Sequence, residues 1–166
     1  MGLFPQERKL RTAEITLARN VFRDRLPYSW IRIKDDFGLS DRAWCEPGIF
    51  GHFILHMGPV GFGDCTTFDR IKTEGQVTRN VYIHELTHAW QGFNGQNYVL
   101  DSLWNQCGGA FTGTDPYAYT AGNEWSSYNC EQQGNIVEDW FRFGMSTSSV
   151  RFRYIRDNIR QGRVGE

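Results

Sequence analysis

The chain of 166 residues has little of what marks membrane or nucleic-acid-binding proteins. No run of about 18 apolar residues is present, which excludes a membrane span. The formal net charge is only −1, so neither nucleic acid nor an anionic membrane is expected as the main partner. The four cysteines include no C-x-x-C pair, so zinc bound by cysteine has little support. We therefore expect one ordinary globular domain spanning residues 1–166.

The first thirty residues mix charged and apolar positions and lack the apolar core of a signal peptide. This pattern predicts synthesis in the cytoplasm, with any export depending on a dedicated machine. Thiols stay reduced in that compartment. We therefore expect packed free thiols, rather than two disulfides, at the four cysteines Cys45, Cys65, Cys107 and Cys130.

The most informative stretch is residues 81–91, which contains His84-Glu85-Leu86-Thr87-His88, an H-E-x-x-H pattern. Residues four apart share one face of a helix, so His84 and His88 can bind the same metal ion. Glu85 lies about a quarter-turn from that face, within reach of a water on the metal. The pattern predicts a zinc (Zn²⁺) site with Glu85 as its general base.

The apolar residues of this helix, Ile83, Leu86 and Trp90, lie on the side opposite the two histidines. We expect a buried apolar back and a polar front that carries the ligands. Thr78 or Asn80 is the expected cap at the start, and Gly92 marks the expected end.

Elsewhere the pattern predicts an α+β domain with a small sheet. Helical periodicity covers residues 12–26, with Thr12 as cap and Pro27 as stop, and then residues 98–105, 123–144 and 150–161. Alternation predicts strands at 30–34 and 49–57, whereas 35–48 and 58–63 read as loops or breaks. His52 and His56 would share one strand face, and we interpret them as structural.

A catalytic zinc typically has three protein ligands and one open position. The metzincin continuation would need Gly at position 91 and His at position 94, where this chain has Gln91 and Asn94, so that class is excluded. A Glu from a second, antiparallel helix fits best, and Glu131 is the preferred third ligand. The alternatives are Glu138, Glu124 or a histidine.

Helical spacing puts Glu131, Asn135 and Glu138 on one face of that second helix. Asn135 or Glu138 would then hold a ligand imidazole from behind the metal. Gly134 is unusual inside a helix, and we interpret it as permitting close approach to residues 81–91.

These segments resemble the gluzincin branch of zinc metallopeptidases. More narrowly, much of residues 12–143 resembles the small zincin-like proteins associated with bacterial Rhs and Vgr elements, on residues 13–22, 84–91 and 131–141. The resemblance implies a zincin-like domain, Glu131 as ligand, and a toxin or effector delivered by a type VI secretion apparatus, with a spike component or an immunity protein as partner. The chain differs from the thermolysin-type pattern at Asn135, where that pattern has Asp. An amide supplies no negative charge there, so a lower metal affinity is expected.

The leading hypothesis is a zinc-dependent metallopeptidase that hydrolyses peptide or amide bonds of a protein or a peptidoglycan stem peptide. Zinc would lower the pKa of its bound water towards about 7, and Glu85 would take the proton. A neutral donor would help to hold the oxyanion. Tyr128 is the first candidate for this donor, and Tyr117 and Tyr119 are the alternatives.

The rival hypothesis is a non-catalytic interaction module of a secretion assembly that keeps zinc only to hold its helices. Glu85 argues against it, because a structural site closes its fourth position with another protein ligand and needs no base.

Overall fold

The computed structural model describes residues 5–37, 42–47, 51–71, 76–95 and 117–165. Within these ranges the chain is mixed α/β, with one small sheet and five α-helices, in agreement with the expected fold class. The expected helix at 98–105 and Cys107 lie outside the described residues.

The sheet has four short strands: β1 (Glu7–Lys9), β2 (Ile31–Lys34), β3 (Trp44–Pro47) and β4 (Phe53–His56). Their order is β1-β2-β4-β3, with β2 parallel to β4 and both outer strands antiparallel to their neighbours. Both predicted strands are confirmed, although β4 is shorter than residues 49–57. The predicted loop at 35–48 is wrong in part, because Trp44–Pro47 pairs with β4 in a contact that the local sequence does not reveal.

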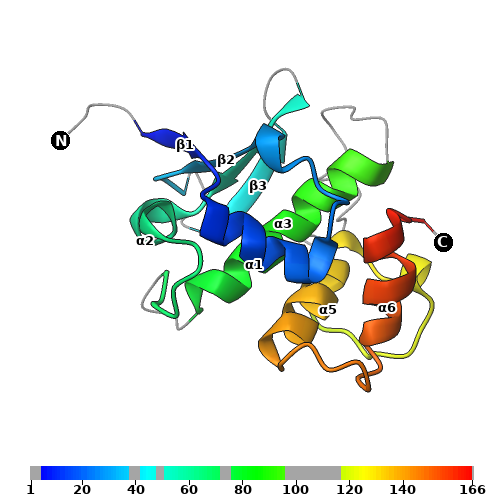
Figure 1. Ribbon diagram of the computed structural model, residues 1–166. Helices are drawn as coiled ribbons and strands as arrows, with labels where there is room; N and C mark the ends of the chain where they lie inside the picture. The colour runs from blue at the N-terminus through cyan, green and yellow to red at the C-terminus, as the bar shows by residue number, and fades with distance from the viewer. Residues whose placement is uncertain (1–4, 38–41, 48–50, 72–75, 96–116, 166) are drawn as a thin grey trace.

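The long helix α3 (Thr78–Gly95) lies at the centre, with the sheet on one side and α5 (Cys130–Arg142) on the other (Figure 1). The remaining helices are α1 (Thr12–Phe22), α2 (Gly58–Gly63) and α6 (Phe152–Asp157), and short 3-10 turns are η1 (Tyr28–Trp30), η3 (Trp125–Ser127) and η4 (Ile159–Gln161). The core is formed by apolar side chains of the sheet and of α1, α3 and α5, including Phe22, Ile33, Leu55, Ile83 and Ile136.

Three predictions in the first part of the chain need correction. The helix predicted for residues 12–26 ends at Phe22, because Arg23 has a φ of 52° and turns the chain before Pro27 is reached. Its N-cap is Arg11 rather than Thr12. The expected break at 58–63 is the short helix α2, with Pro59 in its first turn, where a proline is tolerated.

The predicted helix at 123–144 is also divided. Residues 125–127 form η3, and α5 begins at Cys130 because Asn129 caps it. The Asn129 side chain accepts a hydrogen bond from the Gln132 backbone N–H (2.8 Å), and the Gln132 side chain accepts one from the Asn129 N–H (3.1 Å). This reciprocal capping box sets the start of the helix one residue before Glu131.

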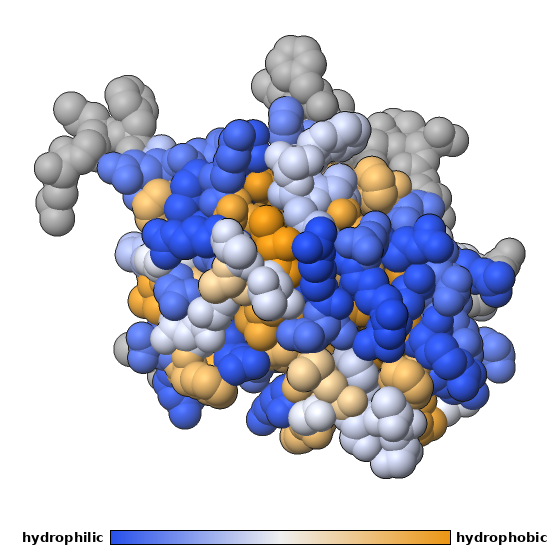
Figure 2. Space-filling model, viewed as in Figure 1, coloured by the Kyte–Doolittle hydropathy of each residue, from blue (hydrophilic) through white to orange (hydrophobic). Residues whose placement is uncertain are grey.

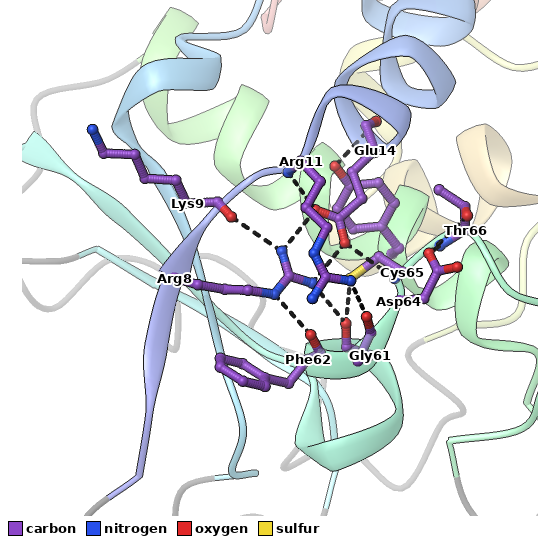
Figure 3. A network of polar contacts seen from close by, with 11 residues as sticks. Arg8, Lys9, Arg11, Glu14, Gly61, Phe62, Asp64, Cys65 and Thr66 are labelled. Atoms are coloured by element: carbon purple, nitrogen blue, oxygen red, sulfur yellow. Dashed lines mark hydrogen bonds and ion pairs between the residues drawn. The ribbon is translucent and has the colours of Figure 1, made fainter.

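An ion pair between a partly buried arginine and a buried glutamate, the Arg8–Glu14 clamp, joins β1 to α1, to α2 and to the segment after α2 (Figure 3). Arg8 donates two hydrogen bonds to the Glu14 carboxylate, at 2.8 and 2.6 Å, and one to the Phe62 carbonyl at 2.7 Å. The same carboxylate accepts from the backbone N–H groups of Arg11 (2.7 Å) and Cys65 (3.2 Å). The clamp therefore satisfies both charges inside the fold.

The cysteine prediction is confirmed for two residues and wrong for one. Cys45 and Cys65 are buried free thiols, and burial raises the pKa of both. Cys130, however, is disulfide-bonded.

The face of the molecule seen in Figure 2 is mainly hydrophilic, with separate smaller hydrophobic areas. None of the described helices has the length and apolar character needed to cross a bilayer.

Candidate metal centre

Helix α3 carries the H-E-x-x-H pattern at the centre of the fold and is buried all round from Val81 to Gln91. The expected apolar back is present, but the expected polar front is also buried: His84, Glu85 and His88 are only 6–7% exposed. The helix continues past Gly92 to Gly95. The cap prediction is wrong, because Thr78 is already the first residue of the helix and Asn80 lies inside it. The Thr78 hydroxyl donates to the Asp69 carbonyl at 2.7 Å.

The imidazoles of His84 and His88 meet the Glu131 carboxylate of α5. Glu131 Oε2 lies 3.2 Å from His84 Nε2 and 3.5 Å from His88 Nε2. One donor atom from each of the three residues falls within 4.8 Å of the others. Within the part of the chain that the structure describes, this is the one group of three such side chains able to share an ion, so the three predicted ligands are brought together.

Gly134 lets the two helices approach at this point. A Cβ built on Gly134 would lie 2.7 Å from His84 Cε1 and 2.9 Å from His84 Nε2, closer than real Cβ contacts allow. The prediction that Gly134 permits close approach to residues 81–91 is confirmed. Any side chain here would displace the ring that forms one third of the cluster.

Behind His84, the Nδ1 atom lies 3.2 Å from Glu138 Oε2. This contact has the length of an ion pair but is not aligned as a hydrogen bond. Of the two residues predicted to support a ligand imidazole, Glu138 is therefore in place. Asn135 is not, because its side chain donates to the Tyr117 carbonyl at 3.0 Å.

Behind His88, the Nδ1 atom lies 2.8 Å from Gln91 Oε1. The Gln91 amide in turn donates to Gln133 Oε1 at 2.8 Å and to the Cys130 carbonyl at 3.2 Å. Sequence reasoning missed both glutamines as parts of the site. The spacing of Gln91, three residues after His88 on the same helix, was the signal available for the first of them.

The electrostatics of the cluster favour a bound cation. Burial by itself would lower the pKa of His84, but its contacts with Glu131 and Glu138 raise that pKa to about 10. Burial would raise the pKa of Glu131, but the two imidazoles lower it well below its usual range. Carboxylates thus stabilise positive charge at the imidazoles, and a divalent ion can replace that charge. The donor set of two imidazole nitrogens and one carboxylate oxygen fits zinc.

Glu85 lies beside the cluster and is 6% exposed. Burial raises the pKa of its carboxyl group, and the negative charges of Glu131 and Glu138 act in the same direction, while His88 and His84 lower it. A carboxylate with a raised pKa is a better proton acceptor, as a general base requires.

The three candidate tyrosines have different surroundings. Tyr128 donates from its hydroxyl to the Thr120 carbonyl (2.7 Å) and contacts the Tyr154 hydroxyl (3.1 Å), so its hydroxyl belongs to the packing around α6. Tyr119 bonds to Asp139 and Arg151. Tyr117 is the candidate beside the cluster, with its ring 6.4 Å from that of His84.

The other candidate ligands lie elsewhere. His56 Nε2 is 3.2 Å from Glu46 and its Nδ1 is hydrogen-bonded to Asp36, which agrees with the structural interpretation. Glu124 lines a separate polar cavity of about 280 Å³ beside α6. Neither His52, His56 nor Glu124 joins the group formed by His84, His88 and Glu131.

Fold and site together define a mixed α/β domain with a buried cluster of two histidines and a glutamate between two packed helices. The type VI secretion system spike protein VgrG2b of Pseudomonas aeruginosa is 32% identical over 162 residues, 93% of this chain. The chain spans only 15% of the length of that spike protein. The effector domain of Pseudomonas aeruginosa VgrG2b, a solved structure, is 29% identical and superposes with a TM-score of 0.61 over 89% of this chain and 81% of that one. No family model matches the sequence. The chain is therefore homologous to the VgrG2b effector domain.

Proposed function

We propose that the chain is a zinc-dependent peptidase domain of the zincin type that acts as a type VI effector. The observation that carries the enzymatic part is the meeting of His84, His88 and Glu131 within 4.8 Å, with Glu85 buried beside them. The observation that supports the effector part is the homology to the VgrG2b effector domain.

His84, His88 and Glu131 would hold the zinc ion. When bound at such a site, zinc supplies Lewis acidity and lowers the pKa of a bound water towards about 7. Glu85 would accept the proton of the attacking water and return it to the leaving amine, which is the role of a general base followed by a general acid. Burial of Glu85 and of both histidines keeps bulk water away from these transfers.

Tyr117 replaces Tyr128 as the proposed donor to the developing oxyanion. Burial and the charge of Glu131 raise the pKa of Tyr117, so its hydroxyl keeps its proton near neutral pH. The Arg42 guanidinium donates to the Tyr117 oxygen and lies over its ring, 5.2 Å from the centroid. This contact polarises the O–H in the direction that stabilises a negative oxygen nearby.

The substrate class follows from the chemistry rather than from a recognised pocket. Such a site cleaves amide bonds of a protein or of a peptidoglycan stem peptide. VgrG2b is named as a type VI secretion system spike protein. By analogy, the proposed partner of this chain is a component of such a spike, and an immunity protein is the alternative partner.

The decisive experiment compares zinc content and hydrolysis in four proteins: the unaltered chain, Glu85→Gln, Glu131→Ala, and Glu7→Gln as an exposed control on β1. Denatured protein and purified sacculi serve as substrates. We expect Glu85→Gln to bind zinc but lose at least 10²-fold in rate, Glu131→Ala to lose tight zinc, and Glu7→Gln to behave as the unaltered chain.

Two outcomes contradict the proposal. Stoichiometric zinc in Glu131→Ala would remove that residue from the ligand set. Zinc bound to the unaltered chain without any hydrolysis that Glu85→Gln lacks would leave only a structural metal. For the donor, Tyr117→Phe should lower kcat by about 10²–10³ with zinc retained, whereas Tyr128→Phe should not.

A further inference from the structure

The two histidines of the cluster are supported by chemically different partners. His84 faces the carboxylate of Glu138, whereas His88 faces the neutral amide of Gln91. The amide is not isolated, because a chain of buried hydrogen bonds continues from it through Gln133 to the backbone in front of α5. Gln91 and Gln133 are 8% and 6% exposed, so water does not compete strongly for these contacts.

The orientation of each amide in this chain is determined by backbone carbonyls. Gln133 Nε2 lies 3.2 Å from the Trp125 carbonyl and 3.3 Å from the Tyr128 carbonyl. A carbonyl oxygen can only accept, so the NH₂ end of Gln133 must face these two groups and its oxygen must face Gln91.

The same reasoning determines the orientation of the Gln91 side-chain amide. Its Nε2 lies between Gln133 Oε1 (2.8 Å) and the Cys130 carbonyl (3.2 Å), and both of these atoms accept. The Gln91 oxygen therefore faces His88 Nδ1, which must carry a proton to donate to it at 2.8 Å. In a neutral imidazole the lone pair then lies on Nε2, the atom that faces Glu131.

We propose that Gln91 and Gln133 form a positioning relay that keeps the His88 proton on Nδ1 and so directs the Nε2 lone pair to the metal position. The proposal rests on the metal site of the proposed function. It assigns the carbonyls of Trp125, Tyr128 and Cys130 as the origin of this orientation. The segment before α5 therefore contributes to the site through its backbone, although the Tyr128 hydroxyl does not.

The relay has a second consequence for charge. Glu85, Glu131 and Glu138 already surround the cluster. An amide behind His88 orients the ring as a carboxylate would, but adds no fourth negative charge. With fewer negative charges around it, a bound cation would keep more of its positive charge and would polarise a substrate carbonyl more strongly.

The test uses the full chain and three variants, Gln91→Leu, Gln133→Leu and the double variant, with Gln161→Leu as a control at an exposed glutamine of η4. The zinc dissociation constant is measured by chelator competition. The ring N–H signals of His84 and His88 are followed by NMR in zinc-loaded protein labelled with ¹⁵N-histidine.

We expect Gln91→Leu to weaken zinc binding by about 10–100-fold, and Gln133→Leu to weaken it less, by about 3–10-fold. The double variant should bind zinc no more weakly than Gln91→Leu, because the second residue acts through the first. The Nδ1–H signal of His88 should disappear in Gln91→Leu, while that of His84 persists. Gln161→Leu should match the unaltered chain.

The relay is overturned if Gln91→Leu binds zinc within twofold of the unaltered chain and keeps the His88 Nδ1–H signal. It is equally overturned if the effects of the two single variants add fully in the double variant. Should Gln91→Leu fail to fold, the test uses Gln133→Leu instead. An unchanged zinc affinity together with an unchanged His88 Nδ1–H signal in that variant rejects the relay.

Failure of the proposed function gives a different result. If the unaltered chain binds no zinc, the metal site is wrong, but the His88 tautomer can still be read from ring nitrogen shifts in metal-free protein at alkaline pH. A proton on Nε2 in that experiment rejects the relay by itself, and a proton on Nδ1 supports it.

Discussion

The molecule buries charge in two places that differ in how the charge is balanced. In the Arg8–Glu14 clamp, one guanidinium meets one carboxylate, and two backbone N–H groups bind the same carboxylate. At the metal cluster, the imidazoles of His84 and His88 meet the carboxylate of Glu131, with two more carboxylates close by.

The difference separates a finished structural contact from a site that takes up a ligand. A buried ion pair that is fully hydrogen-bonded needs nothing further, whereas excess buried carboxylate requires protons or a cation. The clamp joins the N-terminal segments to each other, and the cluster connects α3 to α5. We expect the clamp to respond to loss of either partner, and the cluster to respond to metal and to pH.

The largest effect is expected at the clamp. Glu14→Ala leaves Arg8, whose side chain is 15% exposed, without its partner and should lower the free energy of unfolding by about 3 kcal/mol. Urea unfolding measures this. Glu7→Ala removes an exposed contact to Arg32 at 3.7 Å and should cost at most about 1 kcal/mol. Equal costs for the two variants would show that burial gives the clamp no special role.

Zinc should stabilise the folded protein through the metal cluster, independently of the clamp. At free zinc of about 100 times the dissociation constant, linkage predicts about 2.7 kcal/mol of added stability. This increment should vanish in Glu131→Ala and persist in Glu14→Ala, as measured by urea unfolding with zinc and with a chelator. A zinc increment that survives in Glu131→Ala would place the bound metal elsewhere.

A smaller effect is expected where α5 approaches α3. Gly134→Ala puts a Cβ against the His84 ring and should cost about 1–3 kcal/mol while weakening zinc binding. Gly63→Ala is the matched control, because a Cβ at Gly63 has nothing within 4 Å, and it should change stability by less than about 0.5 kcal/mol. Normal zinc binding by Gly134→Ala would mean that the ring can move without harm.

In the metal-free protein, stability should depend on pH, and the change per pH unit should be small. The pKa of His84 rises from 6.5 to about 10 on folding, so its stabilising contribution is complete below about 6.5 and is lost as pH rises towards 10. Between these values the free energy of unfolding should fall by about 1.4 kcal/mol per pH unit. The pKa of Glu14 is lowered, so the clamp loses stability only as pH falls below about 4.5.

Urea unfolding from pH 6.5 to 8.5 in chelator measures this slope. With zinc in excess the trend should reverse, because the imidazoles must be deprotonated to bind metal. His84→Gln removes one titrating ring and should reduce the metal-free slope, and the raised pKa of His88 should maintain the remainder. An unchanged slope in that variant would assign the pH dependence to another group.

Local geometry was predictable from sequence. The spacing of His84 and His88, the helical face shared by Glu131 and Glu138, and the close approach at Gly134 all follow from 3.6 residues per turn and the size of glycine. Strand β3 was missed because its pairing partner, β4, lies outside any local window. The break before α5 was also missed, although the Asn129-x-x-Gln132 pattern is a recognisable capping signal.

The choice of Tyr128 depended on an assumption about the helix. Tyr128 was placed one turn before Glu131 on a continuous helix, which would bring its hydroxyl towards the metal. In the structure Tyr128 precedes the helix with extended backbone angles, and its ring packs against Tyr154 of α6. A side-chain direction of this kind depends on a neighbour that is distant in sequence.

By itself the sequence determined that two imidazoles share a helix face with a carboxylate beside them, because helical spacing is a property of the local chain. Only the tertiary structure decided that Glu131 completes the cluster, that Gln91 and Gln133 hold His88, and that Tyr117 lies nearby. The contacts of Glu131, Gln133 and Tyr117 join residues of separate segments, and their geometry depends on how those segments pack, which no local pattern encodes. The Gln91–His88 contact lies within α3, but the direction of the Gln91 amide depends on Gln133 and Cys130 of α5.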